Sequence, residues 1–142
     1  MDNLTAKAST VIDEPVAAVW RALVTPETIK RYMFGATVVS DWKEGSPIVW
    51  RGEWKGKPYE DKGEILRFDA GHTLKYTHWS PLSGTPDTPE NWHTVTIEVE
   101  GQGAQTRVSL SQDGNHSESE RQHSESNWAK MLEVLKETVE RG

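Results

Sequence analysis

The sequence contains no cysteine. This absence excludes disulfide bonds, catalysis by a thiolate and cysteine-based zinc sites, and it leaves only histidine and carboxylate side chains as metal ligands. Long apolar runs are also missing, since no stretch approaches the ~18 residues of a membrane-spanning helix. The chain begins Met-Asp-Asn-Leu-Thr, which is not a basic segment followed by an apolar one. We therefore expect a cytoplasmic protein without a membrane span.

Positive charge is in deficit, because 16 Lys and Arg residues stand against 22 Asp and Glu residues, a formal net charge of −6. Nucleic acid would be repelled by this charge, so no nucleic-acid partner is expected. The aromatic residues are dominated by tryptophan, with seven Trp beside three Tyr and two Phe. At 142 residues the chain has the length of one domain, and we expect residues 1–142 to form a single domain.

The N-terminal part of the sequence predicts one strand followed by two short helices. Residues 4–12 favour a strand, and the acidic turn 13–15 ends in a proline that is typical of a helix start. Apolar residues at i, i+3, i+4 and i+7 from Val16 to Leu23 then form one helical stripe. A second short helix is expected to begin at Pro26.

A period of two replaces the helical period in the middle of the chain, which predicts an antiparallel meander with one buried face. Gly63 is a candidate bulge beside the adjacent Ile65 and Leu66, and Trp79 falls on the wrong side of its strand. The connection 80–91 contains three prolines and predicts either a lid or, as the interpretation we favour, a rigid wide turn. The expected strands are 36–42, 47–54, 59–69, 72–80, 92–100 and 104–112.

A capping box predicts the start of a long C-terminal helix, with Ser117 at the N-cap and Glu120 three residues later. An apolar stripe from Trp128 to Val139 extends this helix to about Glu140. A twisted antiparallel sheet with one apolar face and a long amphipathic helix together indicate an α+β fold with two layers.

The element order and several local strings resemble the START-like (SRPBCC) superfamily. Residues 12–15 (IDEP) and 19–23 (VWRAL) resemble the opening of that superfamily. The strings at 32–35 (YMFG), 41–48 (DWKEGSPI), 56–63 (GKPYEDKG) and 127–128 (NW) resemble its AHSA-like branch, the C-terminal domain of activators of heat-shock protein ATPase. The resemblance covers essentially the whole chain.

This resemblance implies the helix-grip fold, in which an antiparallel β-meander curves around a long C-terminal helix and two short helices follow the first strand. It also implies a deep, mainly apolar cavity between the sheet and the C-terminal helix, which the superfamily uses for lipids and other hydrophobic molecules. It implies no shared reaction and no cofactor.

The candidates for lining such a cavity are side chains with inward strand parity, side chains near the cavity mouth, and side chains on the inward stripe of the C-terminal helix. Each of them has a plain structural alternative, because the same positions can be filled by core packing. They are Tyr32, Met33, Phe34, Trp50, Trp54, Tyr76, His78, His93, Val95, Ile97, Val108, Leu110, Arg121, Ser124, Trp128, Met131, Leu132 and Leu135.

The histidines among these candidates have two interpretations. His78 and His93 share the inward parity of their strands, so they could handle a proton, or they could be strand-end histidines bonded to the backbone. Local spacing identifies no nucleophile or carboxylate partner for either, so we assign no catalytic residue. The spacing of His116, Glu120 and His123 is compatible with a metal, but His116 lies outside the helix, and we interpret the trio as a solvated face without metal.

By helix geometry, Arg121 lies between Ser117 and Ser124 on the inward face of the helix, in a polar patch that precedes the apolar stripe from Trp128. A buried unpaired guanidinium is costly, so this side chain must reach water, a carboxylate or the acidic head of an amphipathic ligand. The interpretation that Arg121 reaches solvent at the sheet edge is slightly favoured.

The leading hypothesis is a non-catalytic carrier or sensor that holds a small apolar or amphipathic molecule. One alternative is a co-chaperone that regulates a heat-shock protein ATPase through its surface, for which an exposed apolar patch would argue. Another is an enzyme of the aromatase, cyclase or hydratase type that uses His78 or His93 with Tyr76.

Overall fold

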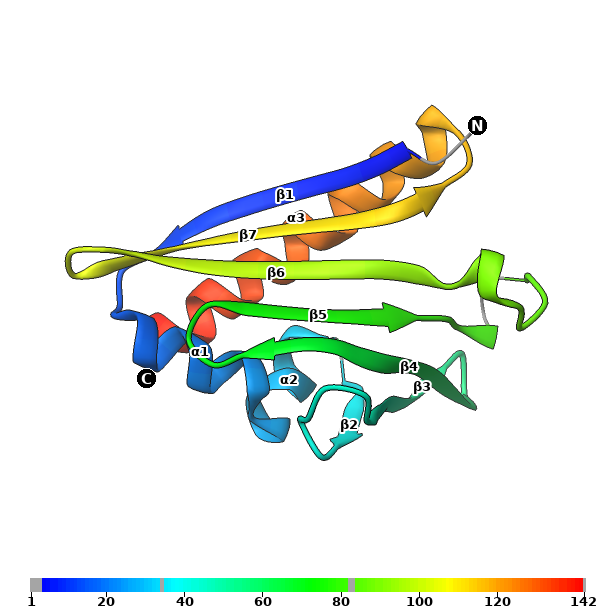
Figure 1. Cartoon of the computed structure of the whole chain (residues 1–142), viewed down its shortest axis with the longest axis horizontal. Coiled ribbons are helices and arrows are strands. Elements are labelled where there is room, and N and C mark those ends of the chain that lie inside the picture. Colours follow the sequence, from blue (N-terminus) through cyan, green and yellow to red (C-terminus); the bar gives the residue numbers. More distant parts are fainter. Residues whose placement is uncertain (1–3, 34, 82–83, 142) are drawn as a thin grey trace.

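The computed structural model describes residues 4–33, 35–81 and 84–141, and it does not place the side chain of Trp54. In this part of the chain, seven strands form one antiparallel sheet in the order β1-β7-β6-β5-β4-β3-β2, and a long helix ends the chain (Figure 1). Two short helices follow the first strand. This arrangement confirms the predicted α+β helix-grip fold.

The helices and strands lie close to their expected bounds. The fourth strand begins at Lys57, two residues earlier than expected, because Lys55 and Gly56, with φ of 51° and 79°, make a two-residue turn. The last strand runs to Asn115 and not only to residue 112. The elements are β1 (Leu4–Ile12), α1 (Val16–Val24), α2 (Pro26–Tyr32), β2 (Thr37–Ser40), β3 (Pro47–Trp54), β4 (Lys57–Asp69), β5 (Thr73–His78), the 3-10 helix η2 (Pro89–Asn91), β6 (His93–Gln102), β7 (Gln105–Asn115) and α3 (Glu118–Arg141).

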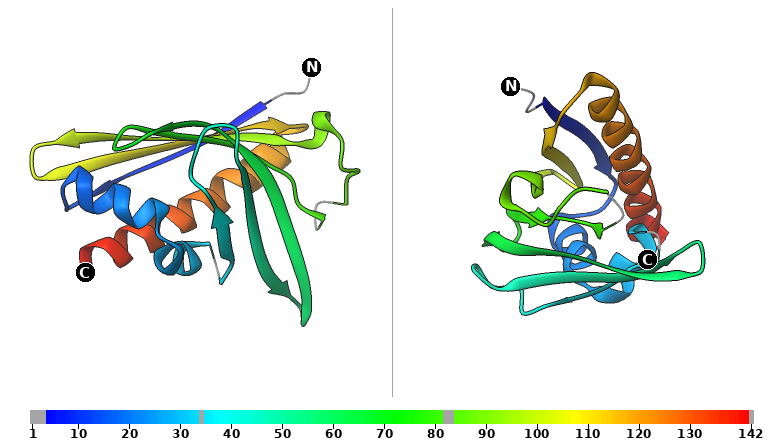
Figure 2. Two further views of the ribbon diagram at one scale, coloured as in Figure 1. Left: turned by 60° about the horizontal axis from the view of Figure 1, so that its bottom comes forward. Right: turned by 90° about the vertical axis from the view of Figure 1, so that its right-hand side faces the viewer.

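One face of the sheet is covered by the three α-helices. Helix α3 runs mainly along β1, while α1 and α2 lie beside the C-terminal part of α3 (Figures 1 and 2). The long β3–β4 hairpin bends away from the remaining strands and continues past the helices (Figure 2). The inner face of β3, β4 and β5 therefore extends the concave side of the sheet beyond α3.

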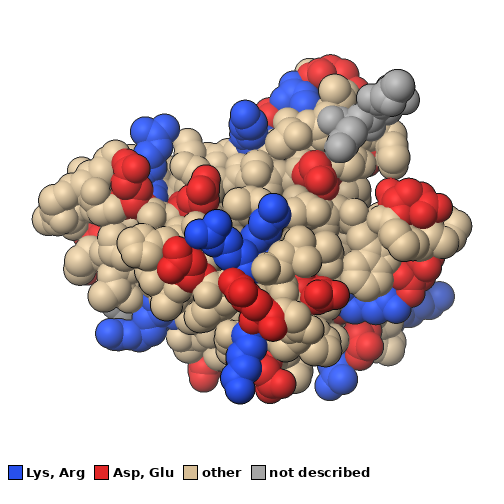
Figure 3. Space-filling model, viewed as in Figure 1, with Lys and Arg blue, Asp and Glu red and all other residues tan. Residues whose placement is uncertain are grey.

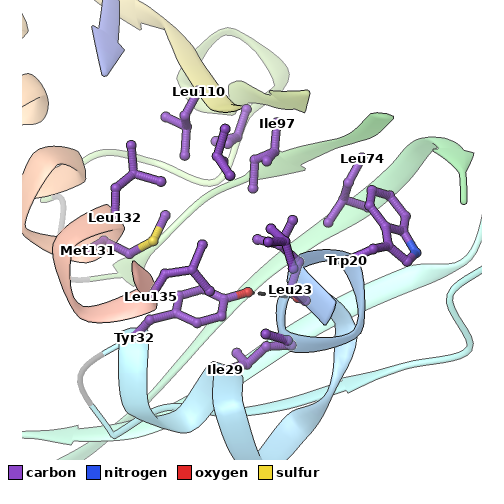
Figure 4. Close-up of a cluster of buried hydrophobic side chains, with 14 of the residues drawn as sticks. Trp20, Leu23, Ile29, Tyr32, Leu74, Ile97, Leu110, Met131, Leu132 and Leu135 are labelled. Atoms are coloured by element: carbon purple, nitrogen blue, oxygen red, sulfur yellow. Dashed lines mark hydrogen bonds between the residues drawn. The ribbon is translucent and has the colours of Figure 1, made fainter. Parts of the chain in front are cut away.

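Strand parity places the apolar side chains on the inner face, as the alternation predicts. Leu74, Ile97 and Leu110 from three neighbouring strands are buried there, with Leu74 near Trp20 of α1 and Leu110 near Leu132 of α3 (Figure 4). Each such side chain removes apolar surface from water, at ~25 cal/mol per Å². The core therefore joins the sheet to all three helices.

The bulge in β4 lies at Leu66 and not at Gly63. Gly63 pairs in register with Ile48, whereas the β4–β5 register shifts between Ile65 and Arg67. This bulge inserts one residue, so Ile65 is fully buried while the adjacent Leu66 is 41% exposed. The sequence left the parity of this stretch open, with Gly63 as a candidate bulge, and the register places the bulge at Leu66.

The start of α3 has the predicted cap, since the Glu120 amide donates to the Ser117 hydroxyl over 3.1 Å. Just before it, the buried Asn115 joins three segments. Its Nδ2 donates to the carbonyl of Leu4 over 3.0 Å, and its Oδ1 accepts from the Ser124 hydroxyl over 2.9 Å. Asn115 therefore ties β1 and α3 to the end of β7.

We expect Asn115→Ala to lower the free energy of unfolding by ~1 to 3 kcal/mol, because buried polar groups lose their partners. Denaturant unfolding followed by circular dichroism measures this change. The exposed Asn127 of the same helix provides the matched control, since Asn127→Ala is expected to change stability by less than ~0.5 kcal/mol. Equal effects of the two substitutions would contradict the assignment of Asn115 as a structural tie.

In the described part of the chain, no helix is both long enough and apolar enough to cross a membrane.

Candidate ligand-binding site

The inner face of β3 and β5 carries an aromatic cluster. Trp50 and Tyr76 are both buried, and their ring centroids lie 5.1 Å apart in a tilted arrangement. The Trp50 ring also contacts the edge of the His78 ring at 5.0 Å. Burial raises the pKa of Tyr76, so its phenol stays neutral at physiological pH. The Trp50 ring therefore contacts both the buried Tyr76 and His78.

His78 has a carboxylate partner on the neighbouring strand. Its Nε2 lies 3.0 Å from Oδ2 of Asp61, and the two side chains are 24% and 15% exposed. A carboxylate accepts hydrogen bonds and donates none. We therefore assign a proton to Nε2 of His78, which donates the hydrogen bond to Asp61. Asp61 faces inward because it pairs with Trp50 in the β3–β4 register.

Tyr59 completes this end of the inner face. It pairs with Gly52, and the absence of a side chain there lets the Tyr59 ring pack across the backbone, since a Cβ at Gly52 would come within 2.6 Å of the Tyr59 hydroxyl oxygen. Partial burial and, secondarily, the nearby charge of Asp61 raise the pKa of Tyr59. The site therefore ends in one phenol, one carboxylate and one imidazole.

An apolar cavity lies next to this cluster, beneath the sheet. It is lined by Leu23, Ile29, Tyr32, Met33, Trp42, Ile48, Trp50, Leu74, Tyr76 and Ile97, and its volume is about 10 Å³. A space of ~10 to 15 Å³ holds one water molecule, so the side chains of the protein fill the region in this state. The sequence left open whether the cavity is open or filled by its own side chains, and in the described structure it is filled.

The position of this cavity differs from the expectation. It lies between the sheet and the two short helices α1 and α2, and none of its described lining residues belongs to α3. The reason is that Met131, Leu132 and Leu135 of α3 are fully buried in direct packing against the core. Tyr32 of α2 is fixed at the cavity wall because its hydroxyl donates to the Leu23 carbonyl over 2.7 Å, which Figure 4 shows.

The polar candidates on α3 are held by other residues of the chain. Arg121 is 25% exposed and bound by Glu118 and Glu125 of its own helix. The hydrogen bond from Arg121 is the main cause that lowers the pKa of Glu118. Ser124 donates to Asn115, and Trp128 donates from Nε1 to Gln112. Two carboxylates thus already satisfy the guanidinium, so the structure gives no support to a role in binding an acidic ligand.

We accordingly expect Arg121→Gln to leave the affinity for a carboxylic acid such as decanoic acid unchanged. Isothermal titration calorimetry of the wild type and the variant measures this directly. A selective loss of decanoic acid binding, with decanol binding retained, would restore Arg121 as an acid-binding residue.

The remaining candidates divide between core and backbone contacts. Val95, Ile97, Val108 and Leu110 are buried on the inner face of β6 and β7. His93 pairs with His78 in the sheet, but its Nδ1 lies 2.9 Å from the Asp113 carbonyl oxygen. That contact agrees with the strand-end interpretation. Phe34 and the side chain of Trp54 lie outside the described residues.

The connection after β5 lies on the outer face of the sheet. Asp87 binds Lys62 and accepts a 2.7 Å hydrogen bond from Trp92 Nε1, and these bonds lower the pKa of Asp87. Lys62 also lies 5.6 Å from the Trp79 ring centroid, so Trp79 faces outward with it. The described part of this connection is therefore a turn that side-chain contacts hold on the face opposite to the aromatic cluster.

The residues that the structure places include no metal cluster and only a few exposed large apolar side chains. No three metal-binding side chains among them come together. Val11, Val39 and Leu66 are the exposed large apolar side chains, and the first two lie on opposite edge strands. Acidic and basic side chains are interspersed on the face shown in Figure 3.

Asp61 and Tyr59 were not among the sequence-based candidates. The sequence feature that could have identified these two residues is the turn Lys55-Gly56. A two-residue hairpin turn there pairs Trp50 with Asp61 and Gly52 with Tyr59. The sequence pattern predicts a turn over residues 55–58 and a strand from residue 59, and a four-residue turn leaves the register of the two strands undetermined.

An antiparallel sheet against a long C-terminal helix, with a small apolar cavity under an aromatic inner face, defines the helix-grip class of α+β proteins. Residues 13–140 match the family model described as "Activator of Hsp90 ATPase homolog 1-like protein", and the chain belongs to this family. No curated protein matches the chain.

Several solved structures are similar over nearly the whole chain. Protein ChR145 from Cytophaga hutchinsonii, a solution structure, is 57% identical with a TM-score of 0.87, and the match covers 99% of this chain and 97% of that one. Protein MLL2253 from Mesorhizobium loti is 20% identical with a TM-score of 0.76 and coverage of 97% and 98%. The Aha1 dimer from Colwellia psychrerythraea is 18% identical with a TM-score of 0.74 and coverage of 96% for both chains. The last two similarities show the fold alone.

Proposed function

We propose that this protein is a carrier or sensor that binds a small, mainly apolar molecule on the inner face of β3 to β5. The observation that carries the proposal is the continuous surface on which Trp50 contacts Tyr76 at the cavity and His78 at its polar end. Apolar walls with a few convergent polar groups are the usual composition of small-molecule sites. Membership of the family and the helix-grip fold support the same function.

Binding requires the cavity to open, because its present volume of about 10 Å³ is far below the ~300 Å³ of a typical ligand site. Met33 is suited to this movement, since it is only partly buried, lines the cavity and directly follows α2. Its unbranched side chain changes rotamer at low cost. We propose that a ligand enters past Met33 and displaces it from the Trp50 wall.

The two alternatives receive less support. A co-chaperone would bind through its surface, but the exposed apolar side chains in the described ranges do not form one patch. The enzyme alternative requires His78 or His93 to act with Tyr76, whereas the hydrogen bonds of these two histidines go to Asp61 and to the backbone of β7. We therefore assign neither a heat-shock protein partner nor a catalytic residue.

Native mass spectrometry with a panel of decanoic acid, naringenin and cholesterol tests the proposed function. We expect a 1:1 adduct with at least one compound, and we expect the adduct to disappear when acid unfolds the protein before it is sprayed. Absence of every adduct, or an adduct that survives unfolding, would contradict binding in the folded interior. Stimulation of a heat-shock protein ATPase in the absence of any adduct would favour the co-chaperone alternative.

A further inference from the structure

The carboxylate of Asp61 is only half satisfied. Its Oδ2 is paired with His78, but its Oδ1 is buried and has no hydrogen-bond partner among the described residues. Native proteins leave few buried polar atoms unpaired, because each such atom loses its hydration without compensation. The unpaired oxygen of Asp61 thus marks a place where a donor is missing.

The neighbouring groups do not supply this donor. The Tyr59 ring, two residues away on the same face, packs across Gly52. Trp50, which pairs with Asp61 in the sheet, presents its ring to Tyr76 and His78. The backbone amide of Lys62 donates to the Trp79 carbonyl over 3.0 Å. The donor is therefore left to water or to a molecule that binds at this end of the aromatic cluster.

We propose that the ligand of this site carries a hydroxyl group that donates a hydrogen bond to Asp61 Oδ1, while its apolar body lies against Trp50 and Tyr76. This inference rests on the proposed function and deepens it, because it names the ligand class as apolar alcohols or phenols. A carboxylic acid would be repelled by the negative charge of Asp61, so an acidic head group is disfavoured at this end of the aromatic cluster. The Arg121 ion pairs leave no competing cation for an acidic head.

The test compares three probes of one shape: 2-naphthol, 2-methoxynaphthalene and 2-naphthoic acid. Their dissociation constants are measured by chemical-shift titration, with the indole signal of Trp50 and the ring signals of His78 as reporters. A hydrogen bond to a charged group corresponds to about tenfold or more in affinity. We expect 2-naphthol to bind at least ~10-fold more tightly than the methyl ether, and the acid to bind most weakly of the three.

Asp61→Leu replaces the acceptor by an apolar side chain of similar shape. We expect this variant to bind 2-naphthol and 2-methoxynaphthalene with similar affinity, so that the ratio of the two affinities is close to one. Asp69→Asn alters a carboxylate at the far end of the same strand and should leave the wild-type ratio unchanged. If Asp61→Leu does not fold, Asp61→Ala replaces it with the same expectation, because alanine also lacks an acceptor. The affinity ratio of the wild type is informative by itself because it needs no variant.

The outcomes separate the two proposals. Equal binding of phenol and ether at Trp50 would overturn the hydroxyl contact, with water as the donor to Asp61, and would leave the proposed function intact. If the folded Asp61→Leu variant kept the tighter binding of 2-naphthol over its methyl ether, this result would also overturn the hydroxyl contact with Asp61. If none of the three probes moved the Trp50 signal, and no adduct formed with the mass-spectrometry panel, the proposed function would fall and the hydroxyl contact with it.

Discussion

Replacing Gly63 with alanine is expected to lower the free energy of unfolding by ~3 kcal/mol or more, because the new methyl group has no space. A Cβ at this position would lie 1.7 Å from the backbone carbonyl oxygen of Thr77 and 2.6 Å from its carbonyl carbon. These are main-chain atoms of the neighbouring strand, which cannot rotate away as a side chain can. The two strands must separate locally, next to His78.

The close approach at Gly63 belongs to an irregular stretch of the β4–β5 ladder. The amide of Glu64 donates to the Thr77 hydroxyl over 2.9 Å, and Lys62 bridges to Trp79 on the other side. Separation of the strands would therefore break bonds on both sides of Gly63. Since small domains are stable by only ~5 to 15 kcal/mol, the loss is a large fraction of the total.

Chemical denaturation of Gly63→Ala measures this effect, and Gly101→Ala is the matched control. Gly101 also lies in a strand without positive φ, and its added Cβ would meet only a Val16 methyl group at 3.1 Å. We expect the control to change stability by no more than ~1 kcal/mol. Similar stabilities for the two variants would show that the strands do not approach as described.

The second large effect is expected for Leu132→Ala, which should cost ~2 to 5 kcal/mol through lost burial and the cavity left behind. Leu132 is 1% exposed and lies between Met131 and the sheet residue Leu110 in the core (Figure 4). The exposed neighbour Glu133 provides the control, since Glu133→Ala should stay within ~0.5 kcal/mol. A cost below ~0.5 kcal/mol for Leu132→Ala would mean that α3 does not pack against the sheet.

The fold could be predicted because local patterns and overall architecture agree. The i, i+3, i+4 stripe that begins at Val16 and the cap at Ser117 set helix starts, and the alternation through Val95 and Ile97 sets the buried face. The exception was Leu66, where a bulge changes the parity and the sequence offers no distinguishing residue type.

The candidate site was less predictable, because it depends on pairing between strands rather than on spacing within one. His78 was a candidate, but its partner Asp61 lies 17 positions away and is placed by the Lys55-Gly56 turn. Arg121 is the opposite case, because its partners Glu118 and Glu125 lie three and four residues away on the same helix. This spacing is visible in the sequence and could have predicted both ion pairs. Which of the candidates contact a ligand stays a prediction.

The most direct measurement for the central proposal is a chemical-shift titration of isotope-labelled protein with the same panel of decanoic acid, naringenin and cholesterol. Binding on the inner face predicts that the indole signal of Trp50 and the amide signals of Tyr76 and His78 move together and saturate at one equivalent. Signals of the outer-face residues Trp79 and Trp92 should stay in place. The proposal would be contradicted if no compound moved the Trp50 and Tyr76 signals, or if only outer-face signals responded.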